Sequence, residues 1–183
     1  MDIEYVSTDT GRVEVRDFLA EHIPGIAATA VPVTAMDAAY APLVPVVRND
    51  DGRIIAAALT CRAQVAAGAA MTGRGQQMFG TALDKHSELD LLAVAGDARG
   101  NGLGTLLVND MEAKLMHQGV RVWFGNVTAD SDVRRLRKFY SELGFTVLAD
   151  GQTLPPLLGK QWVPPFVEPP VFFFYKLLTR SKV

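Results

Sequence analysis

Residues 91–105, LLAVAGDARGNGLGT, decide the fold of this chain. The apolar run Leu91–Ala95 is typical of a buried strand. Glycines then stand at alternate positions: Gly100, Gly102 and Gly104. From there apolar residues recur every four positions, as on one face of a helix: Leu103, Leu107, Met111 and Leu115. The stretch therefore predicts a buried strand that enters an amphipathic helix through a glycine-rich turn.

Such a turn is suited to bind an anion. Glycine lets the backbone curl closely around a ligand, and the first turn of a helix leaves N–H groups unpaired beside a partial positive charge. Arg99 adds a fixed charge that suits a pyrophosphate. The alternative is a tight turn without a ligand, but three alternate glycines are costly for stability alone. We therefore expect a phosphate-bearing ligand here.

Two common phosphate motifs do not fit this turn. A dinucleotide-binding fingerprint that starts at Gly100 needs a glycine at its sixth position, where this chain has Thr105. A P-loop needs a lysine directly after its last glycine, and the first lysine after Gly104 is Lys114. The ligand is therefore expected to be neither a dinucleotide held in the usual way nor a P-loop nucleotide.

The surrounding segments predict a mixed sheet. Asn49–Gly52 carries residues that tight hairpin turns favour, so segments 43–48 and 53–65 are expected to pair as strands. Residues 66–84 lack clear periodicity and are expected to form a loop. Further expected elements are strands over 87–95, 120–124, 145–149 and 171–178 and a helix over 131–143. This order favours a mixed α/β sheet and not a purely parallel one.

Size and composition narrow the class of protein. The 183 residues are 49% hydrophobic and 21% charged, which is typical of one soluble globular domain. A net charge of −2 argues against binding to nucleic acid or to an anionic membrane through the overall charge of the protein. No segment has the roughly 20 apolar residues that a membrane helix needs. We expect a protein that binds no membrane.

The cysteine and histidine content argues against disulfide and metal chemistry. Cys61 is the single cysteine, so no disulfide forms within the chain, and on its strand it is expected to be a buried small hydrophobe. The three histidines are scattered without the spacing of metal ligands, so no metal site is expected. The acidic start lacks the pattern of a signal peptide. The expected location is the cytoplasm.

Two stretches resemble one known family. Arg99–Gly104 matches the Arg/Gln-x-x-Gly-x-Gly/Ala signature of the GNAT superfamily of N-acetyltransferases. Phe139–Phe145 resembles the second family motif, a tyrosine on a helix followed by Gly-Phe at the start of a strand. The resemblance covers Glu88 to Val147, about a third of the chain. It implies an α/β (α+β) fold with a mixed, mostly antiparallel central sheet flanked by helices. It also implies a single GNAT-like domain over 1–183, with a cofactor-binding core at about 86–148 and a Pro-rich insertion at 150–170.

The resemblance implies that acetyl-CoA binds at the glycine turn. In the family this segment binds the pyrophosphate, and the strand before it pairs with the pantetheine arm. The cofactor-binding residues that it implies are Leu92, Ala93, Val94, Arg99, Gly100, Asn101, Gly102, Leu103, Gly104 and Thr105. The family often has Pro in place of Gly96 and Asn in place of Val133. One side-chain contact is then either missing or supplied by a neighbour such as Asp132 or Asn126.

Acetyl transfer to an amine needs a base, a donor for the thioester oxygen and an acid for the leaving thiolate. The resemblance places Tyr140 beside the thioester as the acid, although a tyrosine on an apolar helix face can also be a packing residue. It implies that a backbone N–H near Val94 binds the thioester oxygen.

Glu88 is the expected base, because some lysine-acetylating family members carry a glutamate there. Strand alternation puts Glu88, Asp90, Leu92 and Val94 on one face, so Asp90 can act instead, directly or through water. The alternative is that Glu88 has no catalytic role and is a solvated charge at the end of its strand. His86 is a weaker candidate and is expected at the surface.

The chain is thus expected to transfer the acetyl group of acetyl-CoA to a primary amine by direct attack in a ternary complex. The acceptor is a small-molecule or peptide amine. One alternative is an acyl-CoA sensor without turnover. Another is a transferase that uses a different acyl-CoA or a nucleic-acid acceptor, for which the basic run Arg134–Lys138 is the only support. Aromatic residues 172–175 occupy both faces of one strand, so a helix of this chain or a homodimer partner should cover them.

Overall fold

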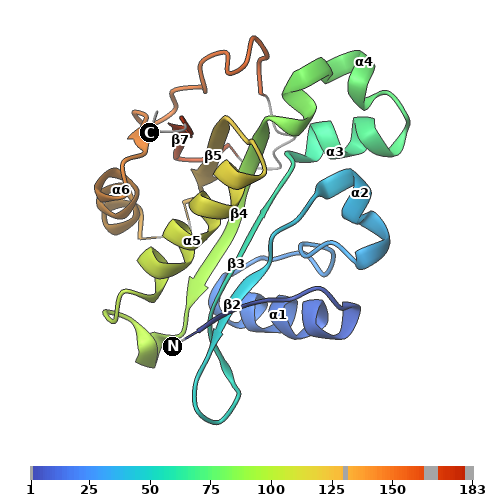
Figure 1. Ribbon diagram of the computed structural model, residues 1–183. Helices are drawn as coiled ribbons and strands as arrows, with labels where there is room; N and C mark the ends of the chain where they lie inside the picture. The colour runs from blue at the N-terminus through green and yellow to red at the C-terminus, as the bar shows by residue number, and fades with distance from the viewer. Residues whose placement is uncertain (1, 130–131, 163–168, 180–183) are drawn as a thin grey trace. The chain divides into compact units, whose positions relative to one another are not determined.

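The structure is a computed structural model that describes residues 2–129, 132–162 and 169–179 (Figure 1). Within these described residues, seven strands form a sheet in the order β1-β2-β3-β4-β5-β7-β6. The pairs β1–β2, β2–β3, β5–β7 and β6–β7 are antiparallel. The predicted α/β fold with a mostly antiparallel sheet and flanking helices is therefore confirmed. The chain divides into two compact units, Met1–Cys61 with Leu89–Lys114, and Arg62–Glu88 with Leu115–Val183.

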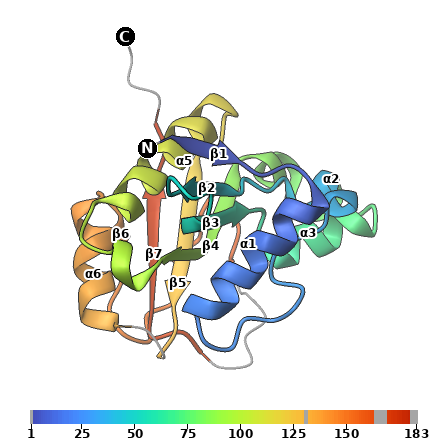
Figure 2. The same cartoon turned by 90° about the horizontal axis from the view of Figure 1, so that it is seen from below.

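The first unit contains the predicted hairpin. Its strands are β1 Ile3–Tyr5, β2 Pro45–Arg48 and β3 Ile54–Cys61. In the turn Gly52 has φ +79°, and the Asn49 side-chain oxygen accepts a hydrogen bond from the Arg53 N–H at 2.9 Å. Helix α1, Asp9–His22, packs on β3 (Figure 2). The second strand ends four residues earlier than predicted.

Arg12, a buried residue of α1, holds the segment that follows this helix through hydrogen bonds. Arg12 donates to both carboxylate oxygens of Asp37, at 2.5 and 3.0 Å, and to the Pro32 carbonyl at 3.0 Å. Asp37 begins α2, Asp37–Tyr40, directly after the short 3₁₀ helix Thr34–Met36. Asp9 accepts two further hydrogen bonds from Thr34. Residues 32–37 are therefore tied to α1 at two points.

The glycine-rich stretch, residues 91–105, folds as predicted. Strand β4 is His86–Val94, the turn contains a 3₁₀ segment over Gly96–Ala98, and helix α5 is Leu103–His117. The four residues predicted for the inner face of α5 are all buried: Leu103, Leu107, Met111 and Leu115.

The start of the second unit is helical and not the predicted loop. Residues 66–84, predicted as a loop, form α3 Gln64–Met71, α4 Gly75–Phe79 and a 3₁₀ helix over Gly80–Asp84. Alanine has the highest helix propensity and needs no long side chain to pack closely. Ala66 and Ala69 are buried in the core of this unit. A helix that buries alanines gives little apolar–polar contrast, so its periodicity is weak in the sequence.

The rest of the second unit is built on two long paired strands. Strand β5, Val122–Val127, pairs with β7, Phe172–Leu177, from Val122↔Leu177 to Val127↔Phe172. Strand β6, Thr146–Val147, pairs with β7 on its other side, and α6, Val133–Glu142, packs near β6. Asp132 caps α6. The sequence alone favours Asp130 or Ser131 as the cap of this helix, and both residues lie outside the described ones.

Aromatic side chains fill both faces of this part of the sheet. Phe172, Phe173 and Phe174 are all buried by this chain, as both-face burial of the strand predicts. Trp162, from the Pro-rich insertion, is also buried and donates from its indole nitrogen to the Leu157 carbonyl at 3.0 Å. Phe166 of the same insertion lies outside the described residues. No helix in the described part of the chain is long and apolar enough to cross a membrane.

Candidate functional site

The glycine turn has a backbone that only glycine adopts easily. Gly100 and Gly102 have φ of +83° and +75°, in the region that side chains disfavour. The Gly102 carbonyl accepts from the Leu106 N–H at 2.9 Å, so the helical hydrogen bonds begin at Gly102. A Cβ built on Gly100 or Gly102 meets no atom within 4 Å. The glycines are therefore required by the turn's conformation, and the space beside them is open.

This turn presents a row of unpaired donors. Among the described residues, the backbone N–H groups of residues 100–105 donate to no acceptor. They belong to the turn and to the first three residues of α5, where the helix dipole favours negative charge. Consecutive free N–H groups with this geometry bind phosphate and similar anions. The arrangement fits the pyrophosphate that the sequence predicts.

The side chains of the turn hold its shape. Arg99 donates from Nε to the Val94 carbonyl at 3.2 Å, and Asn101 donates to the Ala98 carbonyl at 3.2 Å. Leu103 is buried and anchors the start of α5. Arg99 and Thr105 are exposed to solvent. The remaining residues expected to bind the cofactor belong to these same two elements, β4 and the start of α5: Leu92, Ala93, Val94 and Gly104.

Glu88 and Asp90 lie on the same strand in different environments. The predicted alternation is not seen in burial, because residues 86–89 are all buried and Asp90 is exposed. Glu88 is 8% exposed and accepts a hydrogen bond from the Asn126 side chain at 3.5 Å. Surrounding protein atoms desolvate Asp90 and raise its pKa to about 6, although the side chain stays accessible to solvent. Asp90 thus combines solvent access with a pKa near neutrality.

His86 is buried, so its predicted surface position is wrong. Its Nδ1 donates to the Ala82 carbonyl at 2.7 Å, and its Nε2 accepts from the Ala63 N–H at 3.2 Å. Desolvation lowers its pKa to about 4, so the ring is neutral at pH 7. Because both ring nitrogens are engaged, His86 has no nitrogen left to take a proton from a substrate.

Tyr140 lies in the aromatic cluster of the second unit. Its ring stacks on Phe174 with centroids 3.8 Å apart and meets Phe145 edge-on at 5.8 Å. Burial raises the pKa of the phenol well above its ordinary value, so the hydroxyl stays protonated. Among the described residues, the hydroxyl has no hydrogen-bond acceptor. Tyr140 is therefore both a packing residue and an unused proton donor.

Asp132 and Asn126, the neighbours named as alternatives to a missing contact at Val133, both have other partners. Asp132 accepts from the Arg135 N–H at 3.2 Å as the cap of α6. Asn126 donates to Glu88. Sequence reasoning missed this contact, because nothing in the spacing of residues 88 and 126 marks two side chains that meet only after the strands are placed.

The basic run on α6 is largely paired with acids. Arg135 forms an ion pair with Asp132 at 3.4 Å, and Lys138 forms one with Glu142 at 3.6 Å. Arg137 binds Asp150 and lies over the Phe172 ring. These pairs reduce the positive charge that this helix offers to a nucleic acid. In the described part of the chain no group of His, Cys, Asp and Glu is arranged to hold a metal ion.

Known proteins resemble this chain in sequence family and in fold. A family model described as Acetyltransferase (GNAT) family matches residues 17–145. No curated protein sequence is similar enough to this chain to count as a match.

Solved structures show the same fold. A GNAT-family acetyltransferase from Staphylococcus aureus Mu50 has a TM-score of 0.66 at 15% identity, covering 97% of this chain and 100% of its own. Tetrahymena GCN5 has a TM-score of 0.64 at 11% identity, covering 98% and 97%. An aminoglycoside 6′-N-acetyltransferase, solved with coenzyme A, has a TM-score of 0.62 at 13% identity and covers 100% of both chains.

Proposed function

This chain belongs to the GNAT family of acetyltransferases, and from that premise we propose that it transfers the acetyl group of acetyl-CoA to a primary amine. The observation that carries the proposal is the row of unpaired N–H groups at residues 100–105, beside glycines with open space around them. A pyrophosphate needs several donors that do not have to be released from other partners. Arg99 adds a positive charge to the same turn.

The proposed cofactor residues divide by role. The backbone of Leu92–Val94 pairs with the pantetheine arm, and Arg99–Thr105 binds the pyrophosphate. The side chains of Asn101 and Leu103 act indirectly, since one holds the Ala98 carbonyl and the other is buried. A backbone N–H near Val94 stabilises the charge that develops on the thioester oxygen.

Bound acetyl-CoA supplies a thioester whose acyl carbon an amine attacks, so that a C–N bond forms and the C–S bond breaks. We favour Asp90 as the group that accepts the proton of the amine, because it is accessible and its pKa is about 6. Glu88 is the alternative base. Tyr140 donates the proton that the leaving thiolate takes up, since its phenol is protonated and has no acceptor among the described residues.

The acceptor in this proposal is a small-molecule or peptide amine. Among similar structures, one is a ribosomal-protein-S18-alanine N-acetyltransferase from Escherichia coli and another is an aminoglycoside 6′-N-acetyltransferase, so both acceptor types occur on this fold. The ion pairs of α6 disfavour a nucleic-acid acceptor. The lone, buried Cys61 suits a reducing compartment, and we propose a cytoplasmic location.

Acetyl-CoA should raise the thermal unfolding midpoint. A ligand at about 100 times its dissociation constant stabilises the folded state by about 2.7 kcal/mol, which raises the midpoint of a chain this size by roughly 5–11 °C. Scanning calorimetry with acetyl-CoA, CoA, ATP and NAD measures the shift of the unfolding midpoint. A shift with acetyl-CoA and CoA but not with ATP or NAD supports the proposal. No shift at millimolar acetyl-CoA contradicts it. A shift without CoA release in the presence of any of a broad panel of amines would identify a sensor instead.

Asp90→Asn should remove the acidic limb of the pH–rate profile. A base must be deprotonated, so turnover of the wild type should rise with pH through about 6 and then level off. The variant should lose about 10²–10⁴-fold in turnover and this rise with it. Glu88→Gln is the matched comparison on the same strand. If Glu88→Gln removes the limb and Asp90→Asn keeps it, the base is Glu88.

A further inference from the structure

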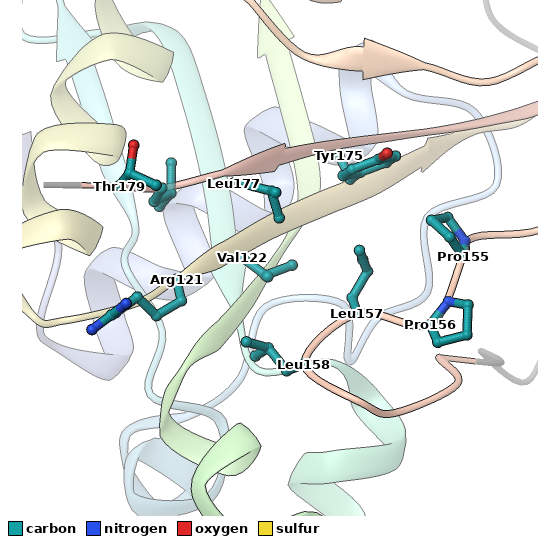
Figure 3. Close-up of a pocket in the computed structure, with 10 residues that line it drawn as sticks. Arg121, Val122, Pro155, Pro156, Leu157, Leu158, Tyr175, Leu177 and Thr179 are labelled. Atoms are coloured by element: carbon teal, nitrogen blue, oxygen red, sulfur yellow. The ribbon is translucent and has the colours of Figure 1, made fainter.

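An apolar groove of about 510 Å³ lies in the second unit, where Val122 of β5 pairs with Leu177 of β7. Pro155, Pro156, Leu157 and Leu158 of the insertion form one wall. Figure 3 shows the two prolines at one end of the groove and Arg121 with Thr179 at the other. The groove is thus apolar along most of its length and carries a cation at one end.

A second cavity continues the groove at its polar end. It has a volume of about 540 Å³ and shares Arg121, Leu178 and Thr179 with the first. Lys85 and Gly119 line its other side. The Lys85 ammonium lies 3.2 Å from the position that a Cβ on Gly119 would take. The absence of a side chain at residue 119 therefore gives the ammonium room beside the cavity.

In the part of the chain that the structure describes, Lys85 and Arg121 have no acidic partner. Within the described residues, neither the Lys85 ammonium nor the Arg121 guanidinium forms an ion pair or a side-chain hydrogen bond. The acid next to Lys85 in sequence, Asp84, is held by Arg62 at 2.6 Å. Two uncompensated cations at one end of an apolar groove favour an anionic group there, and a guanidinium can bind a carboxylate with two parallel hydrogen bonds.

Leu158 is a residue that stability alone does not explain. It has φ +54° and precedes Gly159, with φ +69°, in a two-residue turn closed by hydrogen bonds between Leu157 and Lys160. Asparagine and glycine adopt this conformation easily, and leucine does so under strain. The Leu158 side chain is 38% exposed. The strained backbone at Leu158 therefore does not serve to bury its side chain. The exposed side chain is suited to contact a ligand in the groove.

We propose that this groove binds a small molecule with an apolar body and a carboxylate. The body lies against Leu158, Leu177 and the two prolines, and the carboxylate is bound by Arg121 and Lys85. Val122 is four residues from Asn126 on β5, which is about 13 Å along a strand. The groove is therefore separate from Glu88, and the proposal does not depend on acetyl transfer.

Calorimetric titration without acetyl-CoA tests the proposal. The probes are phenylbutyrate, indolepropionate and octanoate, with phenylbutyramide and phenylbutylamine as neutral and cationic counterparts of the first. We expect saturable binding of at least one carboxylate at millimolar concentration or below, and no saturable binding of the amide or the amine. Arg121→Gln and Lys85→Gln should each weaken the carboxylate about tenfold, as expected for the loss of a charge-assisted hydrogen bond.

Two further variants test whether the carboxylate binds in the groove itself and not through a general change in charge or stability. Leu158→Asn should weaken binding while raising the unfolding midpoint, because asparagine relieves the strain at φ +54°. Arg74→Gln removes an exposed charge outside the groove and should change nothing. The proposal is overturned if no carboxylate binds, if the amide binds as tightly, or if Arg121→Gln and Leu158→Asn leave the affinity unchanged. The response to acetyl-CoA should persist in every variant, so a failure here is distinct from a failure of the proposed function.

Discussion

Gly102→Asp should abolish the binding of acetyl-CoA. Residue 102 lies among the unpaired N–H groups of the turn, and open space surrounds the position of its Cβ. A carboxylate about 5 Å from one phosphate charge is repelled by about 3 kcal/mol at an effective dielectric constant of about 20. That repulsion lowers the affinity more than a hundredfold for each such charge. The same change at Gly104 is expected to act in the same direction.

The control for this result is Gly102→Asn. Asparagine has the shape of aspartate without its charge, and both tolerate a positive φ better than other side chains. Titration calorimetry should therefore find binding reduced far less in the asparagine variant than in the aspartate variant. Equal affinities in the two variants and the wild type would show that no phosphate lies at this turn.

Tyr140→Phe should lower turnover by about 10²–10⁴-fold, the usual contribution of a positioned acid, while the dissociation constant of acetyl-CoA stays within about twofold. Phenylalanine keeps the ring stacked on Phe174, so the variant removes the hydroxyl and preserves the packing. Steady-state kinetics and thermal unfolding together measure both consequences. The split between rate and affinity identifies an acid at the leaving group.

A matched control removes a tyrosine hydroxyl from the first unit. Tyr5→Phe deletes the hydrogen bond to Asp110, whose oxygen lies 2.5 Å away, without touching a proposed site residue. Turnover should stay close to that of the wild type. If Tyr140→Phe is equally active, Tyr140 is a packing residue alone, and the thiolate takes its proton from another source.

Local patterns predicted the parts of the fold that local physics controls. The turn at Gly100 and Gly102 was predictable because a positive φ leaves few choices of residue. The buried face of α5 was predictable because leucine and methionine at every fourth position must pack on one side. Helix α3 was missed, since its buried positions are alanines and its exposed positions include a valine and a methionine.

The candidate site was less predictable, because its environments arise from contacts between distant segments. His86 was expected at the surface, but its partner Ala63 lies directly before α3 and its partner Ala82 lies in the 3₁₀ helix Gly80–Asp84. The sequence revealed neither helix. Glu88 and Asp90 are two residues apart on one strand and have the same chemistry. The positions of the neighbouring atoms bury Glu88 and give Asp90 a pKa of about 6, and these positions cannot be read from the sequence.

The position of the tryptophans has a spectroscopic consequence. Both indoles of the chain, Trp123 and Trp162, are buried in the second unit, whereas the glycine turn belongs to the first. Intrinsic fluorescence therefore reports directly on one unit, and circular dichroism reports on both. Coincident midpoints in the two signals would mean that the units unfold together. An acetyl-CoA shift seen by circular dichroism and absent from fluorescence would mean that ligand binding at the turn stabilises its own unit alone.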